Sequence, residues 1–235
     1  MNRLAVVFVS YLEVPEERLQ DHFRWNRESY EQFENRLRVY VVSDIDHDLP
    51  SYAESVIYPM DRLPMIAGRR RFSLTMTKNF GIRKAIADGV NVVVCTDVDI
   101  LFPAGCLEWL AAVDEHTARF PVYHMMDYAD HNHMLKIDSG CTGTTSMTAA
   151  NWGRVQYDET YSEYGGDDGA LLADVRSAGL VIDRERRIDH IGHMPGDGDR
   201  IPGHGAETCW GRASGFNRDN AVVNRTNRRC RRCHR

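Results

Sequence analysis

The feature that most constrains the fold is a short apolar run that ends in two carboxylates. Residues 91–96 are rich in β-branched side chains and lie between Gly89 and Pro103, a pattern typical of a strand buried on both faces of a parallel sheet. Asp97 and Asp99 follow this run directly, and residues two apart in an extended segment point to the same side. The sequence therefore predicts two carboxylates at the carboxyl edge of the sheet, where open α/β folds bind ligands.

Paired carboxylates at such an edge are candidate metal ligands. They offer hard oxygen atoms, which suit Mn²⁺ or Mg²⁺, and such an ion is usually shared with a phosphate. The alternative is a pair of turn or capping acids after a strand. The position of Asp97 and Asp99 after a buried strand favours the metal interpretation.

Strand and helix alternate through the first 120 residues, which predicts parallel strands joined by crossover helices. The predicted strands cover residues 4–10, 37–43, 55–58, 91–96 and 121–126, and the predicted helices cover 15–36, 74–87 and 104–117. Further along we expect short strands within 136–147, 154–160, 180–183 and 187–190, and a helix that ends at Gly179. The expected fold class is α/β, a mixed, mainly parallel sheet flanked by helices, in a single domain over residues 1–223.

The last twelve residues differ in composition from the rest of the chain. Residues 224–235 hold six arginines and no acid, although the whole chain has a net charge of −5. Such segments are typical of interaction tails, and we expect this one to be disordered. Cys230, Cys233 and His234 also match a haem-attachment pattern or half a zinc site, and the role of this tail stays open.

Hydropathy and cysteine usage bear on the compartment. No apolar stretch approaches the roughly 18 to 20 residues of a membrane span, and the apolar run at the amino terminus lacks a small-residue cleavage site. The six cysteines are scattered without a dense framework. We therefore expect a cytoplasmic protein with no membrane span.

A second pair of acids follows two glycines. Gly165 and Gly166 would allow a ligand to approach the backbone closely, and Asp167 and Asp168 then fall in the first turn of a helix. Helix capping needs only one such acid, so it does not explain the second. A carboxylate beside small residues is what a general base for a sugar or alcohol hydroxyl requires.

Two late histidines are candidate metal ligands. A neutral imidazole near the sheet edge could complete the coordination of an ion such as Mn²⁺. Most of the ten histidines in the chain must be ordinary surface side chains. Gly192 suggests a loop that bends the next side chain inward, which favours His193 over His190.

In this order and spacing, the motifs resemble those of inverting nucleotide-sugar glycosyltransferases of the GT-A fold. The resemblance is to family-2-like enzymes, with a carboxyl-terminal part similar to that of galactosyltransferases and polypeptide N-acetylgalactosaminyltransferases. The matching segments are 96–100 for the D-x-D motif, 165–168 for the G-G-E-D or G-G-E-N acceptor motif, 192–193 for the late metal-binding histidine, and 78–85 for the N-x-G-x-x-x-A helix. The agreement extends over about residues 4–195.

The resemblance implies a donor site for a nucleotide-diphosphate sugar, with a UDP-sugar favoured. Asp99, supported by Asp97, and His193 would hold Mn²⁺ or Mg²⁺ on the diphosphate. The residues that would line the nucleotide pocket are Ser10, Tyr11, Asp44, Lys78, Asn79 and Asp97.

The resemblance also implies an acceptor site. Asp168 would be the general base and Asp167 would bind acceptor hydroxyls. The first acid of the motif is Asp where the family more often has Glu, so the choice between the two as base stays open. The acceptor could be a glycan, a protein or a hydroxylated DNA base.

Two other functions compete with this interpretation. A sugar-phosphate nucleotidyltransferase also places paired acids on a metal, but it usually needs a Gly-rich, basic loop after the first strand, and residues 10–15 do not form one. A non-catalytic module could instead bind polyanions or nucleic acid through the arginine tail.

Overall fold

A seven-stranded mixed sheet forms the centre of the protein. The computed structural model describes residues 3–10, 16–62, 65–66, 69–70, 73–127, 134–138, 143–160 and 167–191. The strand order of the large sheet is β12-β8-β11-β6-β1-β2-β3. Its parallel part consists of β1 (Leu4–Val9), β2 (Leu37–Ser43), β3 (Ala53–Ile57) and β6 (Val92–Cys95).

The other half of this sheet joins the parallel part through the antiparallel pairing of β11 with β6. β11 (Thr145–Thr148) runs antiparallel to both β6 and β8 (Thr117–Arg119), and β12 (Val181–Asp183) runs parallel to β8. The prediction of an α/β fold with a mixed, mainly parallel sheet is confirmed.

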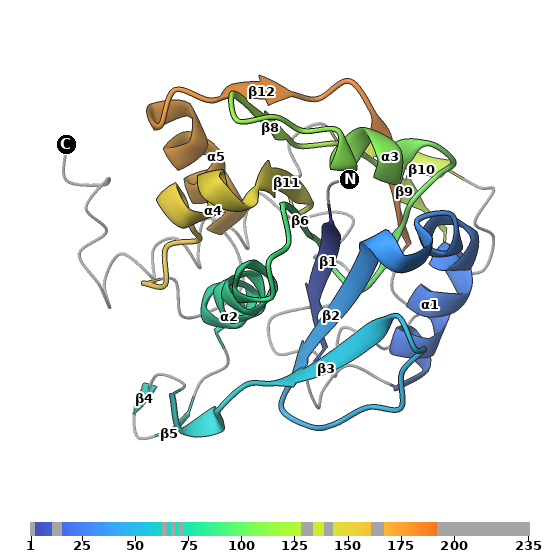
Figure 1. Cartoon of the computed structure of the whole chain (residues 1–235), viewed down its shortest axis with the longest axis vertical. Helices are drawn as coiled ribbons and strands as arrows, with labels where there is room; N and C mark the ends of the chain where they lie inside the picture. Colours follow the sequence, from blue (N-terminus) through green and yellow to red (C-terminus); the bar gives the residue numbers. More distant parts are fainter. Residues whose placement is uncertain are drawn as a thin grey trace.

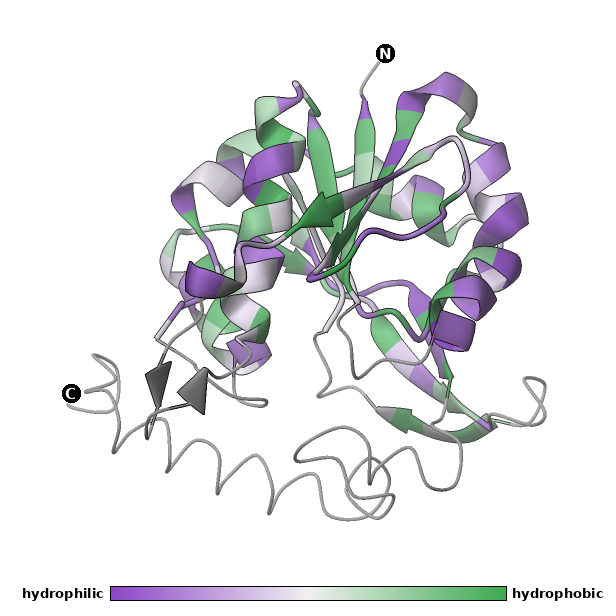
Figure 2. Cartoon of the chain, turned by 90° about the horizontal axis from the view of Figure 1, so that it is seen from below, coloured by the Kyte–Doolittle hydropathy of each residue, from purple (hydrophilic) through white to green (hydrophobic). Residues whose placement is uncertain are grey.

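Helices cover both faces of the large sheet (Figure 1). One face packs against α2 (Leu74–Ala87), α4 (Ala149–Arg154) and α5 (Asp167–Ser177), and the other against α1 (Glu16–Glu31) and α3 (Cys106–Ala111). Apolar residues concentrate in the strands between these two layers, while the outer helix faces are hydrophilic (Figure 2). Within the described part of the chain, no helix has both the length and the apolar character that a membrane crossing requires.

A smaller four-stranded sheet adjoins α1 and α3. Its order is β10 (Met134–Asp138), β9 (Val122–Met126), β13 (Arg187–Ile191) and β7 (Ile100–Leu101). β13 lies in the middle, parallel to β9 and antiparallel to β7. The remaining short elements are β4 (Met65–Ile66), β5 (Arg69–Arg70) and the 3-10 turns Glu34–Arg36 and Met60–Arg62.

Helix α2 has the predicted bounds because both of its ends carry local signals. The Ser73 hydroxyl accepts a hydrogen bond from the Met76 amide at 3.4 Å, and Gly89, at φ +79°, follows the last turn. In the middle of the helix, a Cβ on Gly81 would overlap the Val42 side chain and come within 2.6 Å of Val7 Cγ1. Gly81 therefore allows α2 to lie directly on β1 and β2.

Three elements differ from their sequence prediction. The helix expected over 15–36 is α1, which ends at Glu31 and is followed by the 3-10 turn Glu34–Arg36. The helix expected over 104–117 is only α3, because the Asp114 carboxylate accepts the His116 amide at 2.9 Å in a turn that leads into β8. The strand expected over 154–160 is absent from the described residues. Instead, Thr148 caps the short helix α4, and the chain after it is held by side chains of α2. The domain limit at residue 223 falls outside the described residues and stays a prediction.

Candidate active site

Three neighbouring strands deliver polar side chains to one edge of the large sheet. Ser10 follows β1, Asp44 follows β2 and Asp97 comes shortly after β6. The Ser10 amide donates to the Val42 carbonyl at 2.9 Å, which keeps the ends of β1 and β2 level. This is the carboxyl edge of the parallel strands, as predicted. Tyr11, predicted beside Ser10, lies outside the described residues.

Lys78 of α2 connects the two pairs of acids. Its Nζ lies 3.0 Å from Asp97 Oδ1 and 4.0 Å from Asp168 Oδ1, and the residue is only 1% exposed. The ammonium also lies 5.2 Å from the centre of the Tyr157 ring. Burial alone would lower the pKa of Lys78, but the charges of Asp97, Tyr157 and Asp168 together raise it well above its usual value. Lys78 is therefore a buried cation held by carboxylates.

The other side of Asp97 is packed against backbone. A Cβ on Gly143 would overlap Asp97 Oδ2 and lie 2.8 Å from the Tyr123 hydroxyl. That hydroxyl shares a 2.9 Å hydrogen bond with Thr144, whose own hydroxyl is 2.7 Å from that of Thr96. Asp97 therefore lies between Lys78 and Gly143. Only a glycine at position 143 leaves room for the Asp97 carboxylate.

Asp99 faces a histidine of the small sheet. His190 Nε2 lies 3.4 Å from Asp99 Oδ2, and the Asp99 residue is 7% exposed. The imidazole stacks on Tyr123, with ring centres 5.5 Å apart and planes 21° apart. The Ile191 amide donates to the Asp99 carbonyl at 2.9 Å, which ties this strand to the acid.

The histidine ranked first from the sequence, His193, lies outside the described residues, as does Gly192. The described segments contain no group of three or more His, Cys, Asp or Glu residues that could hold a metal ion. Asp99 and His190 therefore provide a two-residue donor set at this edge, one carboxylate and one imidazole.

Asp167 and Asp168 begin helix α5, in the predicted position. Asp167 is 4% exposed, and its Oδ2 has no hydrogen-bond partner within the described segments. Burial raises the pKa of the Asp167 carboxyl, and burial together with the charge of Asp167 raises the pKa of Asp168 to about 8. Asp97 and this pair place three carboxyls around one ammonium, so the pair tends to keep one proton near neutral pH. Gly165 and Gly166 lie outside the described residues.

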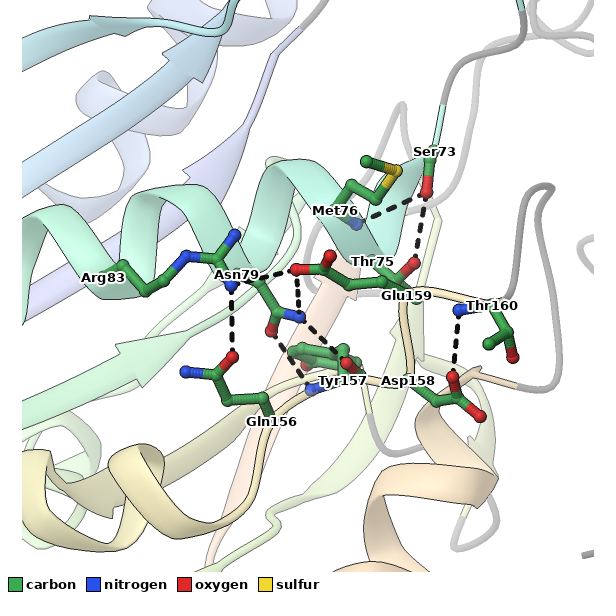
Figure 3. A network of polar contacts seen from close by, with 10 residues as sticks. All are labelled: Ser73, Thr75, Met76, Asn79, Arg83, Gln156, Tyr157, Asp158, Glu159 and Thr160. Carbon is green, nitrogen blue, oxygen red and sulfur yellow. Dashed lines mark hydrogen bonds and ion pairs between the residues drawn. The ribbon is translucent and has the colours of Figure 1, made fainter. Parts of the chain in front are cut away.

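Asn79, predicted to contact the nucleotide, is engaged in the protein interior (Figure 3). Its amide nitrogen donates to the Tyr157 carbonyl at 2.9 Å and to Glu159 Oε1 at 3.1 Å, and its oxygen accepts the Tyr157 amide at 3.1 Å. Arg83, one turn further along α2, donates to Gln156 and Glu159 at 3.1 and 2.9 Å. Asn79 thus holds in place the tyrosine whose ring lies against Lys78.

Sequence reasoning missed several side chains around the site. The His47 ring lies between the Ser43 hydroxyl at 2.9 Å and Glu16 Oε2 at 3.0 Å, beside Asp44. The acidic turn after β2 could have drawn attention to it. Nothing in the sequence indicates that Tyr123 lies near the site. Its strand, β9, is distant from the D-x-D segment in the sequence, and the two come close because β13 pairs with both β9 and β7.

Comparisons with known proteins show similarity in fold alone. No protein-family model matches the chain, and no curated protein matches it. Among solved structures, the mannosyltransferase PcManGT from Pyrobaculum calidifontis, in complex with GDP-Man and Mn²⁺, has a TM-score of 0.56 and 15% identity over 86% of this chain and 61% of its own.

The catalytic domain of a Drosophila β1,4-galactosyltransferase 7, in complex with xylobiose, has a TM-score of 0.53 and 14% identity over 78% of this chain and 65% of its own. A structure of a mutant of that enzyme, with manganese, UDP-Gal and xylobiose, has a TM-score of 0.50 at 14% identity. The chain spans less than two thirds of the length of each of these structures. Its fold is the GT-A fold that the sequence predicts.

Proposed function

We propose that this chain is a metal-dependent, inverting glycosyltransferase that moves a sugar from a nucleotide-diphosphate sugar to an acceptor hydroxyl. The observation that carries the proposal is that Lys78 brings together one acid from each of two distant pairs, lying 3.0 Å from Asp97 and 4.0 Å from Asp168. Solved structures of the same fold hold Mn²⁺ with GDP-Man or UDP-Gal, and we take a UDP-sugar as the first donor to test.

The residues present fit a divalent ion. The Asp99 carboxylate and the His190 imidazole, 3.4 Å apart, are a donor set that suits Mn²⁺ or Mg²⁺. Asp99 and His190 would hold the ion with support from Asp97, and His193 is the alternative histidine. When bound, the ion neutralises negative charge that develops on the departing nucleoside diphosphate.

The nucleotide would lie across the ends of β1 and β2. Ser10 and Asp44 stand at that edge, and the hydrogen-bonded set of Ser43, His47 and Glu16 borders it. Lys78 is too deeply buried to reach a phosphate, since it is enclosed by Asp97, Asp168 and Tyr157. Its role is to balance the charge of the carboxylates.

Asp168 is the proposed general base and Asp167 the proposed acceptor-binding residue. A base works best when its pKa is near the working pH, and burial moves the pKa of Asp168 in that direction. The acceptor O–H bond breaks, its proton moves to the Asp168 carboxylate, and the oxygen bonds to the anomeric carbon on the face opposite the leaving diphosphate. The Oδ2 of Asp167 has no hydrogen-bond partner within the described segments and would accept a hydrogen bond from an acceptor hydroxyl. A glycan, a protein hydroxyl and a hydroxylated DNA base remain the candidate acceptors.

The first test is a thermal-shift panel with UDP-, GDP-, CMP- and TDP-sugars, each with and without Mn²⁺. A ligand that binds only the folded protein raises its melting temperature. We expect a metal-dependent rise with one nucleotide in the wild type, loss of that rise in Asp99→Asn, and its retention in Asp168→Asn. No shift with any donor would refute the donor site.

The second test concerns the chemistry. With water as acceptor, proton NMR of the sugar first released from the donor should show the anomer of inverted configuration. Asp168→Asn should bind donor like the wild type but release sugar far more slowly. Retained configuration, or full turnover in Asp168→Asn, would show that the base is misassigned.

A further inference from the structure

The outer edge of β7 is covered by side chains of a helix rather than by another strand. β7 follows the D-x-D acids, and β13 occupies its other edge. Across the outer edge lies α1, whose residues His22, Asn26 and Ser29 are all buried. Their spacing of four and then three residues places them on one face of the helix.

These three side chains bond to every second residue of the segment that follows Asp97. His22 Nδ1 lies 2.8 Å from the Val98 carbonyl, and Asn26 Nδ2 donates to the Ile100 carbonyl at 2.7 Å. The Phe102 amide donates to Asn26 Oδ1 at 2.8 Å. The Ser29 hydroxyl donates to the Phe102 carbonyl at 2.9 Å. The carbonyls of Val98, Ile100 and Phe102 and the amide of Phe102, which would otherwise lack partners, are thus satisfied by α1.

Helix and strand have dimensions that allow this match. Four residues of a helix rise about 6 Å at roughly 1.5 Å each, and two residues of a strand advance about 6.6 Å at roughly 3.3 Å each. Asn26 therefore stands opposite Ile100 when His22 stands opposite Val98. The face of α1 acts as a substitute strand for the edge.

The hydrogen bonds also fix the state of His22. A carbonyl oxygen only accepts, so Nδ1 must carry the proton that it donates to Val98. Nε2 then accepts from the Tyr30 hydroxyl at 2.6 Å. Burial lowers the pKa of His22 to about 4, against the opposing effects of the Val98 carbonyl and the Asp99 charge. His22 is a neutral donor at physiological pH.

We infer that His22, Asn26 and Ser29 are positioning residues that set the affinity of the D-x-D segment for a divalent ion with its nucleotide. Val98 lies between the two acids, so its tether fixes the backbone from which both carboxylates project. The Ile191 amide fixes the same backbone from the opposite edge, at the Asp99 carbonyl. The inference rests on the proposed function, because it assigns a role in that same metal site.

The test compares a substitution that removes both hydrogen bonds of the His22 ring with one that removes only its bond to Tyr30. His22→Phe keeps an aromatic ring but loses the bond to Val98, whereas Tyr30→Phe removes only the bond on the far side of that ring. Binding of MnCl₂ is measured by electron paramagnetic resonance of free Mn²⁺, with UDP and with GDP. We expect His22→Phe to weaken Mn²⁺ binding roughly tenfold, as loss of groups that orient metal ligands does, and Tyr30→Phe to stay within about twofold of the wild type.

His22→Asn provides a rescue, because its amide nitrogen can stand where Nδ1 stands and should restore most of the affinity. If His22→Phe does not fold, Ser29→Ala, which removes a single hydroxyl, takes its place with a smaller expected loss. Equal Mn²⁺ affinity in folded His22→Phe and the wild type would overturn the inference.

Hydrogen exchange distinguishes failure of the positioning role from failure of the proposed function. In the metal-free protein, the amides of residues 98–102 should exchange faster in His22→Phe than in Tyr30→Phe if α1 fixes that segment. A wild type that binds no Mn²⁺ with either nucleotide would contradict the proposed function. Unchanged exchange over residues 98–102 would contradict the positioning role itself.

Discussion

Lys78 Nζ lies 3.0 Å from Asp97 Oδ1, and this ion pair joins a lysine that is 1% exposed to an aspartate whose side chain is 28% exposed. The pair joins the middle of α2 to the end of the central strand. A buried charge that loses its partner is costly, so the contact should affect both the free energy of unfolding and the protonation of the nearby carboxyls.

Replacing Lys78 by Met should destabilise the protein strongly. The substitution keeps the length of the side chain but leaves Asp97 and Asp168, whose side chains are 28% and 29% exposed, without their cation. A loss of about 1–3 kcal/mol in the free energy of unfolding is expected. Urea unfolding measures it. Lys84→Met is the matched control on the same helix, since Lys84 is 37% exposed where it pairs with Asp88, and should cost less than about 1 kcal/mol. Equal, small losses in both variants would show that the buried pair contributes little.

Stability should fall as pH rises from about 5 to 8. The pKa of Asp168 is raised in the folded protein from 3.8 to about 8, so the folded state binds more protons than the unfolded chain in this window. The limit is about 1.4 kcal/mol per pH unit for one proton. Because the Asp168 side chain is 29% exposed, we expect a loss on the order of 1 kcal/mol in total.

Urea unfolding at pH 5, 6.5 and 8 tests this for the wild type, Asp168→Asn and Asp167→Asn. Both variants should show a shallower dependence on pH, because the two carboxyls raise each other's affinity for one proton. Parallel curves for all three proteins would mean that neither group holds a proton near neutral pH.

Gly81→Ala should be destabilising although alanine favours helices. The added Cβ would overlap Val42 and crowd Val7, and overpacking of this kind costs about 1–3 kcal/mol. Gly153→Ala in α4 is the control, because its Cβ would meet no atom within 4 Å. Thermal unfolding should show a lower melting temperature for the first variant and an equal or higher one for the second. The opposite ranking would mean that α2 can move off the sheet without cost.

The two candidate histidine ligands can be separated by binding of Mn²⁺ with UDP or GDP. His190→Phe keeps a ring against Tyr123 but removes the nitrogen that lies 3.4 Å from Asp99, so we expect markedly weaker binding. His124→Phe on the neighbouring strand β9 is the control and should bind like the wild type. Loss of affinity in His193→Phe with none in His190→Phe would reverse the assignment.

Local signals explain what could be predicted from the sequence. The bounds of α2 follow from a serine cap and a glycine stop, and the common edge of Ser10, Asp44 and Asp97 follows from parallel strands. The place of Asp167 and Asp168 in the first turn of α5 follows in the same way from the glycines before them and the apolar pattern after them.

Long-range packing explains what could not. A lysine such as Lys78 is a common phosphate ligand, so the sequence suggests that role. Its contacts with Asp97 and Asp168, which are distant in the sequence, show instead that it is buried against acids. Asn79 lies in a motif associated with nucleotide binding, yet it pairs with the Tyr157 backbone. His22 and Asn26 interrupt an apolar helix face, but their partners after Asp97 cannot be inferred from spacing.

The central place of β13 in the small sheet determines when the site can form during synthesis. The strand inserts between β9 and β7, and its last residues provide both the imidazole beside Asp99 and the amide bonded to that residue's carbonyl. A growing chain emerges amino terminus first, so β1, β2 and β6 can pair long before β13 exists. The D-x-D acids therefore lack this partner strand until residue 191 has left the ribosome, and the proposed metal site can be completed only late in folding.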